Sequence, residues 1–153
     1  MRSIGLLLLA LLPVCAGAPV QVRQVEPSAL KSGRSFRSYP ARFISCHDGD
    51  TCDFAIHLGL SVSVYQTTRL FGIDTPELRG DSYERAVEVR DFVIRTLQQA
   101  QAIELFVPQR RKCRWDDGGC DERGKYGRLL VEIDADGQSV NGLLLRTGRA
   151  DVY

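Results

Sequence analysis

The segment Ser61-Val-Ser-Val-Tyr-Gln-Thr-Thr-Arg-Leu-Phe-Gly-Ile-Asp-Thr-Pro-Glu77 decides how this chain folds. Its first part, Ser61 to Phe71, is rich in Val, Thr and Tyr with partial alternation, which predicts a β-strand that ends before Pro76. Arg69 stands among the apolar residues of this strand, where a buried charge without a partner is costly. We therefore expect Arg69 to have either an acidic partner in a structural ion pair or a phosphate ligand, whose oxygens match the guanidinium fork.

Four more strands are expected around this segment. The turn Asp48-Gly-Asp-Thr51 separates the first two, and its Asp-Gly pair favours a hairpin because glycine tolerates a positive φ. The strands are expected at Ala41 to Cys46, Asp53 to Leu58, Ile103 to Val107 and Arg128 to Ile133. A long charged loop is expected over residues 108–124, and a further turn over residues 134–137.

Two helices are expected. The first covers Ser82 to Gln101, with Ser82 or Asp81 as its cap, and the second covers Val140 to Gly148. The apolar residues at helical spacing in the first helix are Val87, Phe92, Val93, Ile94 and Leu97. Three strands, a helix and two more strands predict a mostly β fold with helices (α+β). We expect a five-stranded OB-fold barrel with one main helix and a short C-terminal helix.

The start of the chain indicates export. Met1-Arg2 precedes an apolar run from Ile4 to Val14 and then small residues, which is the layout of a secretory signal peptide. Lipid anchoring at Cys15 is an alternative, but Pro13-Val14 matches it poorly. We expect a signal peptide at 1–18, a flexible lead at 19–39 and a domain at 40–153. The mature protein is expected to be secreted or periplasmic, monomeric and without stable membrane association.

Composition allows one soluble domain. The chain has 153 residues, 44% of them apolar and 25% charged, which is ordinary for a globular protein. Its formal charge is +1, so composition alone does not indicate a nucleic-acid binder. Removal of the signal leaves Cys46, Cys52, Cys113 and Cys120, and an even number of cysteines in an exported protein indicates disulfides.

Three pairings of these cysteines are possible. The local pairing, Cys46 with Cys52 and Cys113 with Cys120, fits best because the first pair flanks a tight turn and the second brackets a Gly-rich loop. A zinc site that includes His47 is the competing interpretation. It lacks the close C-x-x-C pairs of structural zinc sites.

Carboxylates and arginines stand at the predicted ends of strands. Asp50 lies in the first turn, and Asp74 and Glu77 lie where the third strand ends. Such turns can meet at one rim of a small barrel, where two aspartates, a backbone carbonyl and waters suit Ca²⁺. Each motif alone is also an ordinary turn, because Asp, Gly and Pro favour turns. Arg128 opens the fifth strand, and Tyr126 beside it either stacks on a base or packs on the barrel.

Four segments together resemble the staphylococcal-nuclease-like (thermonuclease) family: 48–51, 69–77, 125–130 and 140–148. They occur in the family's order and at compatible spacing, over roughly residues 41–153. The resemblance implies an OB-fold barrel with Ca²⁺-dependent phosphodiesterase activity on DNA and RNA. It also implies cleavage of the bond to the 5′ oxygen, which leaves a 3′-phosphate.

The resemblance further implies a role for single residues. It matches Asp50 and Asp74 to metal-binding carboxylates, Thr75 to a residue whose backbone carbonyl binds the metal, and Glu77 to the general base for the attacking water. It matches Arg69 and Arg128 to phosphate-binding arginines, and Tyr126 to a tyrosine near the bound nucleotide. Because negative charge builds up on phosphate oxygens in the transition state, loss of either arginine is expected to cost ~3–4 kcal/mol.

The main alternative is a binding module of the same fold without catalysis. Such relatives should lack Glu77 or one of the two arginines, and this chain keeps all three. A small exported Ca²⁺-binding or interaction domain would leave the arginines without a purpose. Family members commonly continue into a further helix after the position of Tyr153, so we expect reduced stability. Disulfides would offset this by ~2–4 kcal/mol each.

Overall fold

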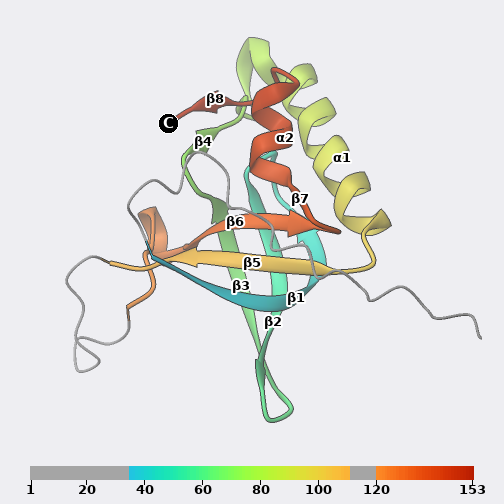
Figure 1. Cartoon of the computed structure of the whole chain (residues 1–153). Helices are drawn as coiled ribbons and strands as arrows, with labels where there is room; N and C mark the ends of the chain where they lie inside the picture. The colour runs from blue at the N-terminus through green and yellow to red at the C-terminus, as the bar shows by residue number, and fades with distance from the viewer. Residues whose placement is uncertain (1–34, 111–119) are drawn as a thin grey trace, which may run out of the picture.

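A computed structural model describes residues 35–110 and 120–153 (Figure 1). The predicted signal peptide, residues 19–34 of the predicted lead and Cys113 lie outside the described residues. The longer strands are β1 (Phe36–Cys46), β2 (Thr51–Gly59), β3 (Val62–Leu70), β5 (Ile103–Pro108) and β6 (Leu129–Ala135). The short strands are β4 (Ile73–Asp74), β7 (Gln138–Ser139) and β8 (Asp151–Val152). The helices are α1 (Tyr83–Gln99) and α2 (Val140–Arg146), with 3₁₀ turns at Gly80–Ser82 and Lys125–Gly127.

A parallel pairing between β3 and β6 closes the sheet into a barrel. The strands follow the order β3-β2-β1-β5-β6 with antiparallel neighbours, and residues 68–70 of β3 then pair with residues 129–131 of β6. Closure satisfies the backbone groups that an open sheet would leave at its edges. The predicted fold class is thereby confirmed: a closed five-stranded, OB-like barrel with one long helix and a short C-terminal helix.

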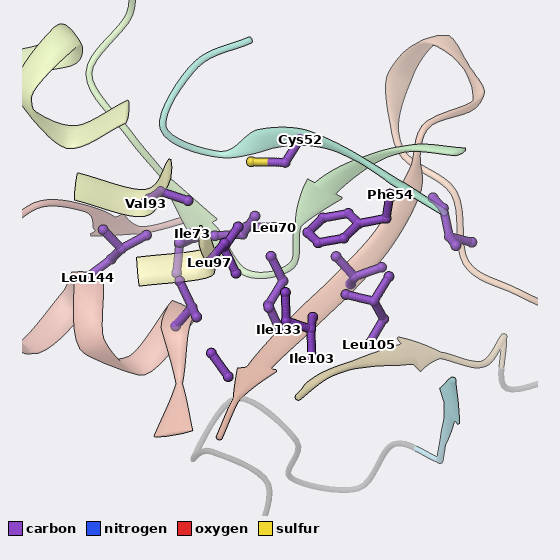
Figure 2. Close-up of a cluster of buried hydrophobic side chains, with 14 of the residues drawn as sticks. Cys52, Phe54, Leu70, Ile73, Val93, Leu97, Ile103, Leu105, Ile133 and Leu144 are labelled. Atoms are coloured by element: carbon purple, nitrogen blue, oxygen red, sulfur yellow. The ribbon is translucent and has the colours of Figure 1, made fainter. Parts of the chain in front are cut away.

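The core fills the barrel and continues under both helices (Figure 2). Alternate residues of the strands point inward, including Phe54, Leu105 and Ile133, because side chains alternate along a strand. The long helix, α1, buries one stripe at helical spacing, which consists of Ala86, Val89, Val93 and Leu97. Of the residues expected on this stripe, Val87, Phe92 and Ile94 are only half-buried.

Several predicted boundaries are wrong, including the ends of both helices, which lie at Gln99 and Arg146. Strand β1 begins at Phe36, inside the predicted flexible lead, because residues 36–39 pair with residues 105–108 of β5. Strand β6 extends to Ala135, which moves the predicted turn to Asp136 and Gly137, both with positive φ. The polar residues near Phe36 gave no local signal for a strand, because this part of β1 depends on pairing with β5, which is distant in the sequence.

A disulfide joins Cys46 at the end of β1 to Cys52 in β2, and their Cα atoms lie 3.9 Å apart. This confirms one of the two predicted pairs. Cys120 is also disulfide-bonded. Disulfides are compatible with an extracellular or periplasmic location, because such bonds persist in oxidising compartments. Over residues 35–110 and 120–153, no helix has both the length and the apolar character needed to cross a membrane.

Candidate active site

The strand register brings the predicted site residues to one end of the barrel. Thr51 of β2 lies opposite Arg69 of β3, and Arg69 lies opposite Leu130 of β6. Arg128, two positions before Leu130, therefore stands near the same end. The β2–β3 pairing thus joins the first two segments, and barrel closure adds the third.

Arg69 bridges the two predicted metal-binding carboxylates. Its Nη1 donates to Oδ1 of Asp50 and its Nη2 donates to Oδ1 of Asp74, each over 2.6 Å. The Asp50 side chain is only 4% exposed, whereas Asp74 lies at the surface. The expected acidic partners of Arg69 are thus present. A guanidinium has five N–H donors, so Arg69 keeps donors for a further anion.

The Asp50 carboxylate sits in surroundings that disfavour its charge. Burial, and then the nearby charge of Asp48, raise the pKa of Asp50 above its usual value. The Arg69 charge and hydrogen bonds from Thr51 Oγ1 (3.0 Å) and the Thr75 backbone N–H (3.3 Å) oppose this rise without cancelling it. A buried carboxylate with an unfavourable charge is a good place for a cation.

Gly49 lets the Asp50 turn lie close to its neighbours. A Cβ at this position would stand 2.7 Å from Cγ1 of Val89 in α1 and 2.9 Å from Oγ1 of Thr75. The expected reason for this glycine is wrong, because the residues with positive φ do not include Gly49. Close approach, rather than a left-handed turn, explains it.

One wall of the site is the segment 75–79. Together with Asp50, Arg69, His47 and Asp48 it lines a cleft of about 180 Å³. Glu77 stands on this wall, 68% exposed, with Nε of Arg79 at 3.2 Å from its Oε2. Ser82 fixes the wall, because its Oγ donates to the carbonyls of Glu77 and Arg79. Its predicted capping role is wrong: Ser82 precedes α1, but its side chain makes no cap hydrogen bond.

Arg128 and Tyr126 lie beside this cleft and do not line it. Nη1 of Arg128 donates to Thr51 Oγ1 over 3.0 Å, and Thr51 in turn donates to Asp50. Tyr126 is 94% exposed and holds a left-handed backbone conformation (φ 62°), which is uncommon for a residue other than glycine. Its ring lies 5.7 Å from the Arg128 guanidinium. Of the two expected roles for Tyr126, packing on the barrel is wrong.

Asp74 is held in place by the last strand. In the β4–β8 pair it lies opposite Asp151, and the Tyr153 backbone N–H donates to the Gly72 carbonyl over 3.0 Å. Like charges directly opposite each other in a sheet repel. The exposed side of the site is therefore acidic as well.

The residues present fit a hard cation. Asp50, Asp74 and the Thr75 carbonyl would offer oxygen ligands, which Ca²⁺ prefers, and Asp50 lacks full compensation for its charge. Among the described residues, no group of three or more His, Cys, Asp and Glu could hold a metal ion. Waters would therefore have to complete the coordination shell.

Sequence reasoning missed the pairing of His47 with Asp53. The sequence suggests His47 only as a zinc ligand, yet His47 lines the cleft and its Nε2 lies 2.8 Å from Oδ2 of Asp53. The predicted pairing of Cys46 with Cys52 contains a signal for this pair, because in that antiparallel register His47 lies diagonally across from Asp53 on the same face of the strands.

No protein-family model matches the chain, and no curated protein matches it.

Proposed function

We propose that this protein is a Ca²⁺-dependent phosphodiesterase of the staphylococcal-nuclease-like kind that hydrolyses DNA and RNA. The observation that carries the proposal is the position of Arg69, which bridges Asp50 and Asp74 beside the wall that bears Glu77. This arrangement supports the proposal because a candidate cation site, a candidate phosphate-binding arginine and a candidate base lie at one barrel end. The Cys46–Cys52 disulfide supports action outside the cytoplasm.

The proposed mechanism uses these residues as follows. The phosphate enters beside Arg69, whose remaining N–H groups bind its oxygens, and Arg128 approaches from β6. Glu77 removes a proton from a water, the water oxygen bonds to phosphorus, and the bond to the 5′ oxygen breaks. The departing 5′ oxygen takes a proton from solvent water and leaves as a hydroxyl group, and Glu77 returns its proton to solvent. The two guanidinium groups stabilise the charge that develops on the phosphate oxygens. Bound Ca²⁺ would supply further stabilisation of that charge.

Cleavage of single-stranded DNA by the mature protein, with Ca²⁺ and with chelator, tests this function. We expect cleavage only with Ca²⁺, and products that end in a 3′-phosphate. Glu77→Gln should lower kcat by about 10²- to 10⁴-fold, as expected for the loss of a general base. Glu84→Gln is the matched control, because Glu84 is an exposed carboxylate in the first turn of α1 outside the cleft.

Circular dichroism and melting temperature must show that each variant is folded. Folded wild type that binds the strand and does not cleave it in Ca²⁺ would point to the binding module instead. Equal losses in Glu77→Gln and Glu84→Gln would also remove Glu77 from the mechanism.

A further inference from the structure

His47 and Asp53 form an anchored pair at the edge of the cleft. The His47 side chain is 59% exposed and lines the cleft, while its Nε2 lies 2.8 Å from Asp53 Oδ2. A carboxylate can only accept, so Nε2 carries the proton in this contact. The ring is thus exposed to solvent and still held in one orientation.

Asp53 is well suited to hold this ring. It lies opposite Ser45 of β1 and Thr67 of β3, so it sits between two neighbouring strands. Thr67 Oγ1 donates to its Oδ1 over 2.7 Å and Ser45 Oγ donates to its Oδ2 over 3.1 Å. Partial burial would raise the pKa of Asp53, but the hydrogen bonds from Thr67, Ser45 and His47 and the charge of His47 together lower it.

The second ring nitrogen of His47 is left for a ligand. Within residues 35–110 and 120–153, Nδ1 has no hydrogen-bond partner. A phosphate oxygen at Nδ1 would be bound by the doubly protonated ring, in which Nδ1 is also a donor. The other charged groups that line the cleft are Asp48, Asp50, Glu77, Arg69 and Arg79. With acidic groups in the majority, an incoming polyanion would gain from one more cationic donor at this edge.

We propose that His47 is a substrate-binding residue that donates a hydrogen bond from Nδ1 to a phosphate group next to the one that is cleaved. Asp53 is its positioning residue. This inference rests on the proposed phosphodiesterase function and deepens it, because it assigns a preference for polynucleotides over single phosphodiesters to one side chain. A purely structural role, in which the pair only stabilises the turn 47–51, is the competing explanation.

The test compares two substrates. A dinucleotide has one phosphodiester and no neighbouring phosphate, whereas a single-stranded oligonucleotide has neighbours on both sides. We expect His47→Ala to raise KM for the oligonucleotide about fivefold and to leave its kcat unchanged, as for the loss of one exposed hydrogen bond. Both constants for the dinucleotide should stay at wild-type values. Equal losses on both substrates, or no loss on either, would overturn the proposal.

Matched controls separate binding from folding. His57→Ala removes the other histidine of the chain, which bonds to Ser63 in the β2–β3 hairpin outside the cleft, and should change neither substrate. Asp53→Asn should raise KM for the oligonucleotide as His47→Ala does. Thr67→Ala loosens Asp53 without removing its carboxylate, so its rise in KM for the oligonucleotide should be smaller than that of Asp53→Asn, and an equal or larger rise would favour the structural explanation.

Failure of the proposed function is recognisable in the same experiment. If wild type cleaves neither substrate, the phosphodiesterase proposal fails. His47 is then judged by the fluorescence anisotropy of the labelled oligonucleotide in chelator. About fivefold weaker binding by His47→Ala would still support the phosphate contact. Equal binding by both proteins, or no binding by wild type, would overturn it.

Discussion

Two aspartates three positions apart, Asp50 and Asp53, have opposite surroundings. Asp50 is buried beside another carboxylate, and its pKa is raised despite the nearby Arg69. Asp53 is held by two hydroxyl groups and an imidazole, and its pKa is lowered. Both carboxylates accept three hydrogen bonds, so burial and a neighbouring carboxylate, and not missing donors, disfavour the charge of Asp50. A bound cation would relieve that unfavourable charge. The turn before β2 thus holds a candidate metal ligand, and β2 itself holds a structural anchor three positions later.

The largest expected effect is that of Arg69→Ala, which would remove the cation that holds Asp50. Loss of a preorganised donor should lower kcat about 10²- to 10³-fold. Breaking a largely buried ion pair should also lower the free energy of unfolding, by about 3 kcal/mol. Single-turnover kinetics and urea unfolding measure the two effects. Wild-type stability in this variant would contradict the view that Asp50 depends on Arg69.

Asp50→Asn should separate activity from stability. We expect about a 10²-fold or greater loss of cleavage, because the buried carboxylate oxygen for the cation is gone. The melting temperature at neutral pH should nevertheless rise. A raised pKa means that the folded state binds the proton more tightly, so ionisation of Asp50 lowers wild-type stability as pH climbs through that pKa.

The advantage of Asp50→Asn should therefore vanish in acid, below the usual aspartate pKa, where wild-type Asp50 is protonated in both states. Ca²⁺ should raise the wild-type melting temperature and leave that of the variant unchanged. Asp53→Asn is the matched comparison and should be less stable than wild type at neutral pH. The lowered pKa of Asp53 means that its ionisation stabilises the folded state. A higher melting temperature for Asp53→Asn would break the contrast between the two aspartates.

The smallest of these effects is expected from the disulfide that encloses the turn. Cys46→Ala with Cys52→Ala should lower the free energy of unfolding by about 2 kcal/mol, as predicted for a short closed loop. Because Asp50 and His47 both lie on this turn, kcat and the KM for oligonucleotides should change together. Calorimetry and steady-state kinetics check both points. A change in kcat alone would show that His47 keeps its position without the disulfide, and a change in KM alone would show the same for Asp50.

The barrel and its helices could be predicted because their signals are local. Alternation in residues 61–71 and helical spacing around Val93 need no knowledge of distant contacts. The start of β1 at Phe36 could not be found this way, because it depends on pairing with β5. The role of Gly49 could not be predicted for the same reason. Gly49 is needed because Val89 and Thr75, which are distant in the sequence, pack closely against it.

The residues of the candidate site could be predicted from the sequence, but the hydrogen bonds between them could not. Arg69 among apolar residues indicated acidic partners, which are present. The link from Arg128 through Thr51 to Asp50 depends on barrel closure, so no single segment contains its signal. The opposite pKa shifts of Asp50 and Asp53 could not be predicted either, because they depend on burial and on hydroxyl groups from neighbouring strands.

The parallel pairing of β3 with β6 has a consequence for how the protein becomes active. The two strands are distant in the sequence, so their pairing carries a large loop-closure entropy and is expected late in folding. Arg69 and Arg128 come to the same barrel end only through that step. A chain in which β2 has paired with β3 but β6 has not closed the barrel would hold Arg69 beside Asp50 and lack Arg128 at that end. Recovery of activity during refolding would therefore time the closure of the barrel.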